Sequence, residues 1–246
     1  MRIENIQRLA DTQVTKFSMT YLHYKPFNRD LSAVIKAYAS GKVVDIGCGN
    51  KPYEKLFGEK VTQYTGCDII QSNLNKVDIL CPANKIPLGD AEFDTAFSTQ
   101  TIEHVEDHQG LVNEAFRLIK PGGYFILAGP MYWHLHEEPY DFFRFTRYGF
   151  EYILQKAGFE LTATKENGGM WTVAGQSLLH AVANSKSKHF FIRITRTIFY
   201  KLRMYWLVNT VFGWLDKVDY NPVNTINYVL VARKPLQQKE KIKTDD

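Results

Sequence analysis

The feature that most constrains the fold is a β-branched run that ends in a glycine turn, Lys42–Gly49 (KVVDIGCG). Val43, Val44 and Ile46 predict a short buried strand. A turn with two glycines between a strand and a helix lets the backbone approach a ligand closely. Further short strands and amphipathic helices then alternate along the chain. This alternation predicts an α/β fold with a parallel sheet covered on both faces.

The same patterns place the remaining elements. Strands are predicted at residues 42–46, 63–68, 76–80, 93–98, 124–128, 159–164 and 227–232. Helices are predicted at residues 31–40, from Pro52 onward, at 110–119, at 146–156 with Thr146 as N-cap, and at 188–215 with a break at Asn209. We therefore expect one domain over residues 1–235, with a helical insertion or lid at about 170–222 and a disordered polar tail at 236–246.

Composition bounds the class of protein. The chain has 246 residues, of which 45% are hydrophobic and 23% charged, as in an ordinary soluble globular protein. The mixed charge of Met1–Asn5 does not fit a secretory signal, and no stretch is long and apolar enough to span a bilayer. The three cysteines, Cys48, Cys67 and Cys81, form no CxxC pair. We therefore expect them to be small packing residues of a protein in the reducing cytoplasm.

Acidic residues near the glycine turn indicate the kind of ligand. Pro52 stands where the dinucleotide fingerprint has its third glycine, and no phosphate-loop lysine pattern is present. Asp45 would repel a phosphate and attract an ammonium or sulfonium group. Asp68 ends the next strand, where α/β nucleotide sites place the carboxylate that binds ribose hydroxyls. Taken singly, Asp45 could be a solvated strand-end acid and Asp68 a turn former.

Four motifs carry a family resemblance. DIGCG at 45–49, IPLGDAEFD at 86–94, TIEHV at 101–105 and LIKPGG at 118–123 resemble class I S-adenosylmethionine-dependent methyltransferases of the type 11 group. The resemblance spans roughly residues 40–165. It implies a Rossmann-like sheet of seven strands with the last antiparallel, a helical insertion before that strand, and S-adenosylmethionine as cofactor.

The resemblance also implies roles for single residues. Gly47, Gly49 and Gln100 would lie at the methionine end of the cofactor. Asp68 would hold the ribose, whereas Asp78 would accept from the adenine amino group and Ile79 would pack on its face. Lys51 departs from the family pattern, which often has a third glycine there.

The segment after the fifth strand, residues 129–146, is rich in aromatic and titratable side chains and should overhang the methyl group. The candidates for a base or for orienting the acceptor are His134, His136 and Asp141, and those for acceptor binding are Tyr140 and Arg144.

Less specific readings of this segment remain open. Asp141 and Arg144, three residues apart, could instead pair with each other, and His136 could cap the loop. Outside this segment, His104 could be a packing or capping residue and not a catalytic one. No metal is expected, because His134, His136 and Glu137 have no wider ligand set around them in the sequence. The run 136–146 resembles one subset of these enzymes, often found beside cell-surface polysaccharide genes, which implies a glycan-type acceptor.

One segment accounts for the net positive charge of the chain. Residues 167–215 contain six Lys or Arg and no Asp or Glu, within a net charge of +4. A basic amphipathic helix at 188–215 could lie on the inner face of a membrane or close over the domain as a lid. Nucleic acid is not expected, because no nucleic-acid motif is present.

Together these features predict an S-adenosylmethionine-dependent methyltransferase for a small-molecule or glycan-type acceptor. Two alternatives stay open: a membrane-associated O-methyltransferase of a quinone or lipid-like phenol, and a non-catalytic S-adenosylmethionine-binding module.

Overall fold

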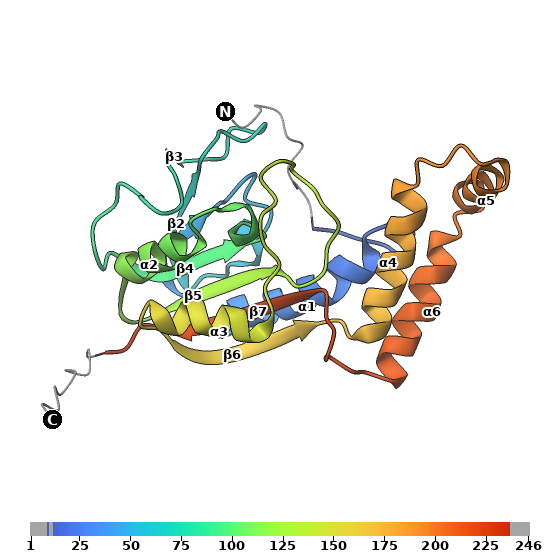
Figure 1. The fold of residues 1–246 in the computed structure, drawn as a ribbon. Coiled ribbons are helices and arrows are strands. Elements are labelled where there is room, and N and C mark those ends of the chain that lie inside the picture. Colours follow the sequence, from blue (N-terminus) through green and yellow to red (C-terminus); the bar gives the residue numbers. More distant parts are fainter. Residues whose placement is uncertain (1–8, 10–11, 237–246) are drawn as a thin grey trace, which may run out of the picture.

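Seven strands form one sheet in the order β3-β2-β1-β4-β5-β7-β6 (Figure 1). The computed structural model describes residue 9 and residues 12–236; the N-terminal residues considered for a secretory signal and the tail from residue 237 onward lie outside this part. β7 pairs antiparallel with both β5 and β6, and the other neighbouring strands pair in parallel. This topology confirms the predicted seven-stranded Rossmann-like sheet with an antiparallel last strand.

The strands and helices have the following bounds. The strands are β1 Gly41–Ile46, β2 Val61–Asp68, β3 Ile79–Leu80, β4 Phe93–Thr99, β5 Ile119–Pro130, β6 Glu160–Asn167 and β7 Asn227–Arg233. The α-helices are α1 Tyr21–Tyr38, α2 His108–Leu118, α3 Arg147–Lys156, α4 Met170–Asn184, α5 Phe190–Lys201 and α6 Tyr205–Val218. Two 3-10 turns, η1 Glu54–Leu56 and η2 Ile102–His104, follow β1 and β4.

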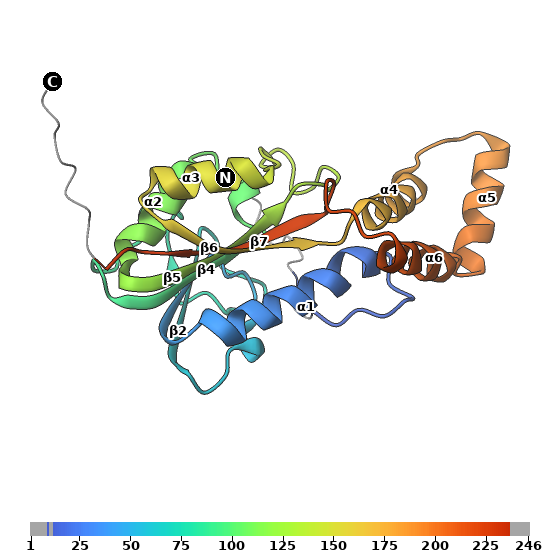
Figure 2. The same ribbon diagram turned by 90° about the horizontal axis from the view of Figure 1, so that it is seen from below.

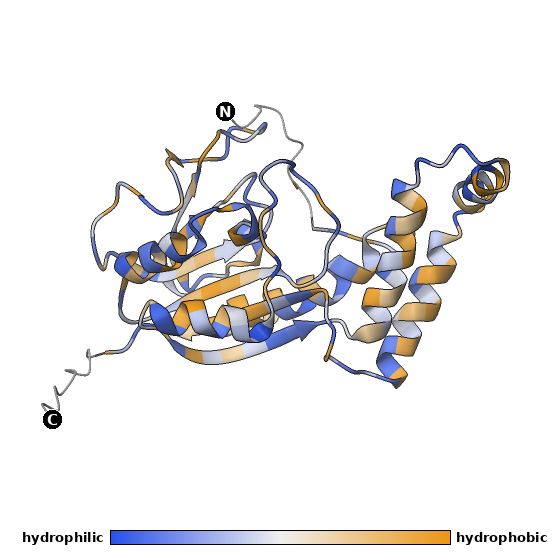
Figure 3. Cartoon of the chain, in the orientation of Figure 1, coloured by the Kyte–Doolittle hydropathy of each residue, from blue (hydrophilic) through white to orange (hydrophobic). Residues whose placement is uncertain are grey.

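Helices cover both faces of the sheet, with α1 on one side and α2 and α3 on the other (Figure 2). The alternation of side chains along β5 explains how one strand serves both layers. Phe125 and Leu127 pack in the core on the side of α2 and α3, whereas Ile126 packs with Phe27 and Leu31 of α1. Apolar residues accordingly concentrate along the central strands (Figure 3). The continuous apolar strands are therefore those of a sheet buried on both faces.

Two helices that cover the sheet begin at side-chain caps. The Thr146 hydroxyl accepts a hydrogen bond from the Gly149 amide at 3.1 Å, which confirms the predicted cap of α3. The Asp107 carboxylate accepts from the Gly110 amide at 2.9 Å and caps α2.

The prediction of an α-helix from Pro52 onward is wrong. Only the turn η1 forms between β1 and β2. The rings of Tyr53 and Phe57 pack against Phe97, at centroid distances of 6.1 and 5.2 Å. These two contacts hold the short connection against the sheet without a full helix.

The third strand is shorter than predicted, with only Ile79 and Leu80 paired. The Gln71 side chain explains this, because its amide donates to the Val77 carbonyl and its oxygen accepts from the Val77 amide. The backbone of Val77 is thus satisfied by a side chain and not by the ladder.

The helical insertion differs from the predicted single helix. α4 lies within the insertion but before the predicted helix at 188–215, and the break between α5 and α6 falls at residues 202–204 and not at Asn209. Asn209 is buried inside α6, where its amide donates to the carbonyl oxygens of Lys16 and Ser18. Its polar side chain therefore fixes α6 to the segment before α1, and Arg203 adopts the positive φ of 49° that ends the preceding helix.

The insertion extends beyond one end of the sheet, with α5 at its far tip (Figures 1 and 2). α4 packs closely on α1 and α6, since a Cβ at Gly175 would lie 2.6 Å from Leu22 and 2.7 Å from Phe212. Within the described part of the chain, no helix has both the length and the apolarity needed to cross a bilayer.

Phe97→Ala should lower the free energy of unfolding by about 3–5 kcal/mol, because Phe97 is fully buried and its loss leaves a cavity between the sheet and α1. Urea denaturation measures the effect. Phe190→Ala is the matched control: Phe190 is 67% exposed, and we expect a change within about 0.5 kcal/mol. Equal effects of the two substitutions would contradict the assigned core.

Candidate cofactor and acceptor site

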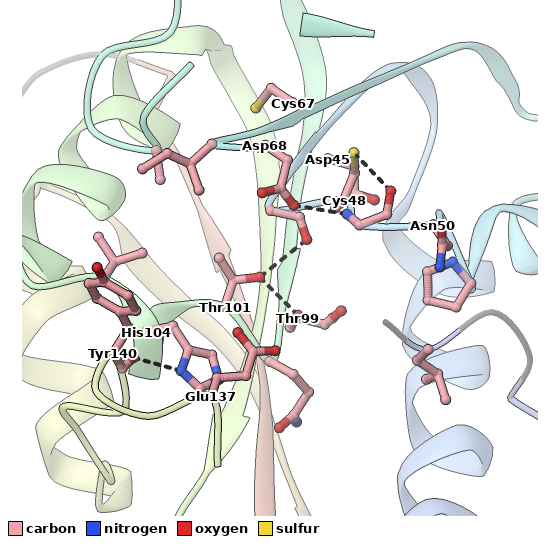
Figure 4. Close-up of a pocket in the computed structure, with 18 of the residues that line it drawn as sticks. Asp45, Cys48, Asn50, Cys67, Asp68, Thr99, Thr101, His104, Glu137 and Tyr140 are labelled. Atoms are coloured by element: carbon pink, nitrogen blue, oxygen red, sulfur yellow. Dashed lines mark hydrogen bonds between the residues drawn. The ribbon is translucent and has the colours of Figure 1, made fainter. Parts of the chain in front are cut away.

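A cavity of about 690 Å³ opens at the carboxyl ends of β1, β2 and β4. Its walls come from the glycine turn after β1, the residues after β2 and β4, the N-terminal part of α1 and the loop between β5 and α3. Figure 4 shows Asp45, Cys48 and Asp68 at one end, and His104, Glu137 and Tyr140 at the other. One cavity therefore joins the two ends that the sequence analysis treated separately.

Hydrogen bonds fix the glycine turn between two strands. Gly47 and Gly49 have positive φ angles of 79° and 50° and line the cavity. A Cβ at Gly47 would lie 2.2 Å from the Thr101 side chain, so only glycine fits against this residue. The Gly49 amide donates to Asp68 Oδ2 at 3.0 Å. This hydrogen bond fixes the backbone of the turn where it lines the cavity.

Two carboxyl groups give this end of the cavity its negative character. Asp45 and Asp68 are 3% and 5% exposed and line the cavity. Burial raises the pKa of Asp45 to about 7, although the Tyr64 hydroxyl donates to its Oδ2 at 2.5 Å and favours the ionised form. A positively charged ligand would stabilise the ionised carboxylate.

Lys51 stands at the position of the family's third glycine and has a positive φ. Its φ is 53°, and its ammonium lies 2.6 Å from Asp78 Oδ2. The Asp78 carboxylate also accepts from the Gly66 amide at 2.7 Å. Asp78 therefore connects Lys51 to β2.

Asp78 and Ile79, the residues expected to bind adenine, do not line the cavity. The Asp78 carboxylate is bonded to the Lys51 ammonium and the Gly66 amide. Ile79 packs against the core on the side of α2. Ile69 and Cys81 occupy the cavity wall in this region.

Gln100, which is predicted to lie near the methionine part, follows β4 and lines the cavity. It has a φ of 51°, and its amide donates to Asn227 Oδ1 at 3.1 Å. This bond links the end of β4 to the first residue of β7.

The loop after β5 reaches back to η2. The amides of Phe142 and Phe143 both donate to the Glu103 carbonyl, at 2.9 and 3.2 Å. This anchoring brings His136 and Tyr140 into the cavity wall. His134, a second candidate base, is not in that wall: its ring packs on His180 at a centroid distance of 4.2 Å.

Asp141 and Arg144 pair with each other, as the less specific reading allowed. Two guanidinium nitrogens lie 2.6 and 2.7 Å from the two Asp141 oxygens. Burial would raise the pKa of Asp141, but its bonds to Arg144 and to the His136 amide lower it to about 2. Neither side chain lines the cavity, because each is committed to bracing the loop.

Sequence reasoning missed the contribution of α1. His23 and Tyr24 line the cavity because α1 begins ten residues earlier than Leu31, the predicted start. Burial lowers the pKa of His23 to about 3. Glu103 lies behind the wall, fully buried, and burial raises its pKa to about 8. Hydrophobic periodicity gives no signal for such polar residues.

Comparisons with known proteins agree with this architecture. The profile of the family described as "Methyltransferase domain" matches residues 44–127. The chain is 29% identical over 100 residues to a probable S-adenosylmethionine-dependent methyltransferase of Mycolicibacterium smegmatis, covering 37% of this chain and 39% of that protein. It is 30% identical over 96 residues to a ubiquinone biosynthesis O-methyltransferase of Idiomarina loihiensis, covering 33% and 39%.

A solved structure shows the same fold over most of the chain. The putative methyltransferase from Bacillus halodurans superposes with a TM-score of 0.52 at 16% identity, covering 84% of this chain and 98% of that one. By sequence, the chain spans only about two fifths of the length of the curated relatives it matches.

Asp45→Asn should remove a pH-dependent loss of stability. The pKa of Asp45 rises from 3.8 to about 7 on folding, so the folded state binds the proton more tightly. The free energy of unfolding contributed by Asp45 therefore falls as the pH rises from about 4 to about 7. Asparagine does not titrate and keeps an acceptor oxygen for Tyr64.

The free energy of unfolding of Asp45→Asn minus that of the wild type should increase by on the order of 2–4 kcal/mol between about pH 4.5 and pH 8. Urea denaturation at the two pH values measures the difference. Parallel pH profiles for the two proteins would contradict the raised pKa.

Proposed function

We propose that this chain, whose residues 44–127 form a class I S-adenosylmethionine-dependent methyltransferase core, transfers a methyl group from S-adenosylmethionine to a small-molecule acceptor. The acceptor class that we propose is a glycan-type hydroxyl. The observation that carries this proposal is the single cavity in which the acid-lined glycine turn faces the loop between β5 and α3. Methyl transfer requires donor and acceptor to meet in line within such a space.

The cofactor fits the first end of the cavity by the chemistry of its residues. The backbone at Gly47 and Gly49 receives the methionine part beside Gln100, and Asp68 accepts from the ribose hydroxyls. Asp45 provides negative charge for the positively charged end of the ligand. Ile69 and Cys81, and not Asp78 and Ile79, offer the surface for the adenine ring.

The acceptor occupies the other end. Trp133 and Tyr140 provide aromatic surface. His136 lines this end together with Glu137, and we assign His136 to orient the acceptor. Asp141 acts through His136, because it accepts from the His136 amide at 3.0 Å and lies 3.3 Å from Nδ1. Asp141 and Arg144 are thus positioning residues, and rate enhancement comes from orientation and exclusion of water.

Asp68→Asn should weaken binding of S-adenosylhomocysteine by about 10- to 100-fold, since it removes charged hydrogen bonds to the ligand. Isothermal titration calorimetry measures the affinity. Asp78→Asn is the control and should stay within about threefold of the wild type, because Asp78 lies outside the cavity. Unchanged affinity in Asp68→Asn, or a larger loss in Asp78→Asn, would overturn the assignment of this end.

The activity itself is tested with labelled S-adenosylmethionine and fractionated lysate of the native organism. The wild type should transfer label to an extractable small molecule, and Asp68→Asn should not at the same cofactor concentration. Intact S-adenosylhomocysteine binding with no transfer into any fraction would favour the non-catalytic binding module.

We also propose that the insertion contacts an anionic membrane surface, which would suit a lipid-like quinone or phenol acceptor. Phe190, Phe191 and Leu202 are 67%, 71% and 70% exposed at the far tip. They lie among the six basic residues of the acid-free segment 167–215. No residue of α4–α6 lines the cavity described above, so this surface is separate from it. Apolar side chains among basic ones suit the interface of anionic lipids.

The double variant Phe191→Ser, Arg193→Glu should lose flotation with phosphatidylserine-containing vesicles, because it removes one apolar anchor and reverses one charge. The wild type should float with these vesicles and not with pure phosphatidylcholine. Unaltered S-adenosylhomocysteine binding shows that the variant is folded. A wild type that stays at the bottom of the gradient would exclude membrane contact.

A further inference from the structure

Three metal-ligating side chains meet where η2 faces the loop between β5 and α3. One ligand atom from each of Glu103, His104 and His136 lies within 4.8 Å of the other two. His104 and His136 line the cavity, and Glu103 is fully buried behind them. We propose that these three side chains bind one divalent transition-metal ion at the acceptor end of the cavity.

The two imidazole rings are held in the tautomer that a metal ligand needs. His104 Nδ1 lies 2.9 Å from the Tyr140 carbonyl oxygen. His136 Nδ1 lies 3.2 Å from the His134 carbonyl oxygen and 3.3 Å from Asp141 Oδ2. Carbonyl and carboxylate oxygens only accept, so each Nδ1 carries the ring hydrogen. A ring N–H donated to such a group is the usual support for a histidine that binds metal through its other nitrogen.

The remaining nitrogens then face each other. His104 Nε2 and His136 Nε2 are 3.1 Å apart. In neutral rings with hydrogen on Nδ1, both Nε2 atoms present lone pairs, and two lone pairs at this distance repel. A shared cation turns that repulsion into two bonds.

Glu103 supplies the negative charge. Neither of its carboxyl oxygens hydrogen-bonds to another described residue, and Oε1 lies 4.0 Å from His104 Nε2. A buried carboxyl group without such a partner is costly unless a cation or a proton compensates it. The Arg144 guanidinium does not hydrogen-bond to the Glu103 carboxylate, because it is paired with Asp141.

The donor set selects the class of ion. Two imidazoles and one carboxylate suit Zn²⁺, Fe²⁺ or Co²⁺, whereas Mg²⁺ and Ca²⁺ prefer oxygen ligands alone. Zinc–nitrogen bonds of about 2.1 Å place neighbouring ligand atoms about 3–3.5 Å apart, close to the observed 3.1 Å. Three protein ligands leave coordination positions open toward the cavity, as in catalytic sites.

A role for the ion rests on the proposed methyl transfer. An acceptor hydroxyl oxygen would take an open position on the ion, which favours loss of its proton to bulk water while the acceptor binds, before water is excluded. The resulting oxygen forms the bond to the methyl carbon as the bond from that carbon to sulfur breaks. The site thus points to acceptors with a hydroxyl group that can reach both the ion and the methyl group.

Calorimetric titration of the chelator-treated full chain with Zn²⁺, without cofactor or acceptor, tests the site. The wild type should bind one ion. Glu103→Gln and His136→Ala should each weaken binding by at least about 10- to 100-fold. His189→Ala, on an exposed histidine of the insertion, should leave it unchanged. Absence of Zn²⁺ binding to the wild type, or equal affinity in all variants, would overturn the proposal.

Two further measurements separate the causes of failure. Co²⁺ should give visible absorption typical of nitrogen and oxygen ligands; a thiolate charge-transfer band would assign the ion to the cysteines and overturn the site. S-adenosylhomocysteine binding in Glu103→Gln should match the wild type, so that lost metal binding is not lost folding. Zn²⁺ binding that depends on Glu103 in a protein without transferase activity would refute the proposed function and leave the metal site standing.

Discussion

The hydrogen bond from the Gly49 amide to the Asp68 carboxylate is the constraint on which the site depends. It ties the turn after β1 to the end of β2, while Thr101 after β4 packs against Gly47 and donates to its carbonyl. Three strand ends are thereby fixed relative to one another. This end of the cavity is therefore built on elements of the sheet and held by hydrogen bonds between them.

The pKa values of two shielded carboxyl groups are shifted in opposite directions at the two ends of the cavity. Asp45 is buried and forms no ion pair with a described residue, so its pKa rises and a positively charged ligand is favoured. Asp141 is also shielded from water, but the Arg144 guanidinium holds its pKa low. The first carboxyl group therefore stays responsive to what enters the cavity, whereas the second is a permanent charge that orients His136. Both carboxyl groups are buried, so the difference between them comes from the Arg144 guanidinium paired with Asp141.

The sequence was sufficient for features set by local chemistry. Alternation, the glycine turn and Asp68 predicted the sheet and one end of the cavity, and Thr146 predicted the start of α3. It was insufficient where contacts between distant segments decide. Asp78 is drawn to Lys51, Val77 is bonded by Gln71, and Asn209 lies within α6 because it bonds to Lys16 and Ser18. Glu103 and His136 are 33 positions apart and meet only through the folded loop.

The placement of the insertion has a consequence for how this chain can change over time. β6 ends at Asn167 and β7 begins at Asn227, and these two residues are partners in the same antiparallel ladder. The whole excursion through α4, α5 and α6 therefore leaves and re-enters the sheet at one point, as an enlarged hairpin connection. Such a segment can be lengthened, shortened or exchanged without altering the register of any strand. The length of the insertion can therefore diverge while the strands that support the cavity keep their pairing.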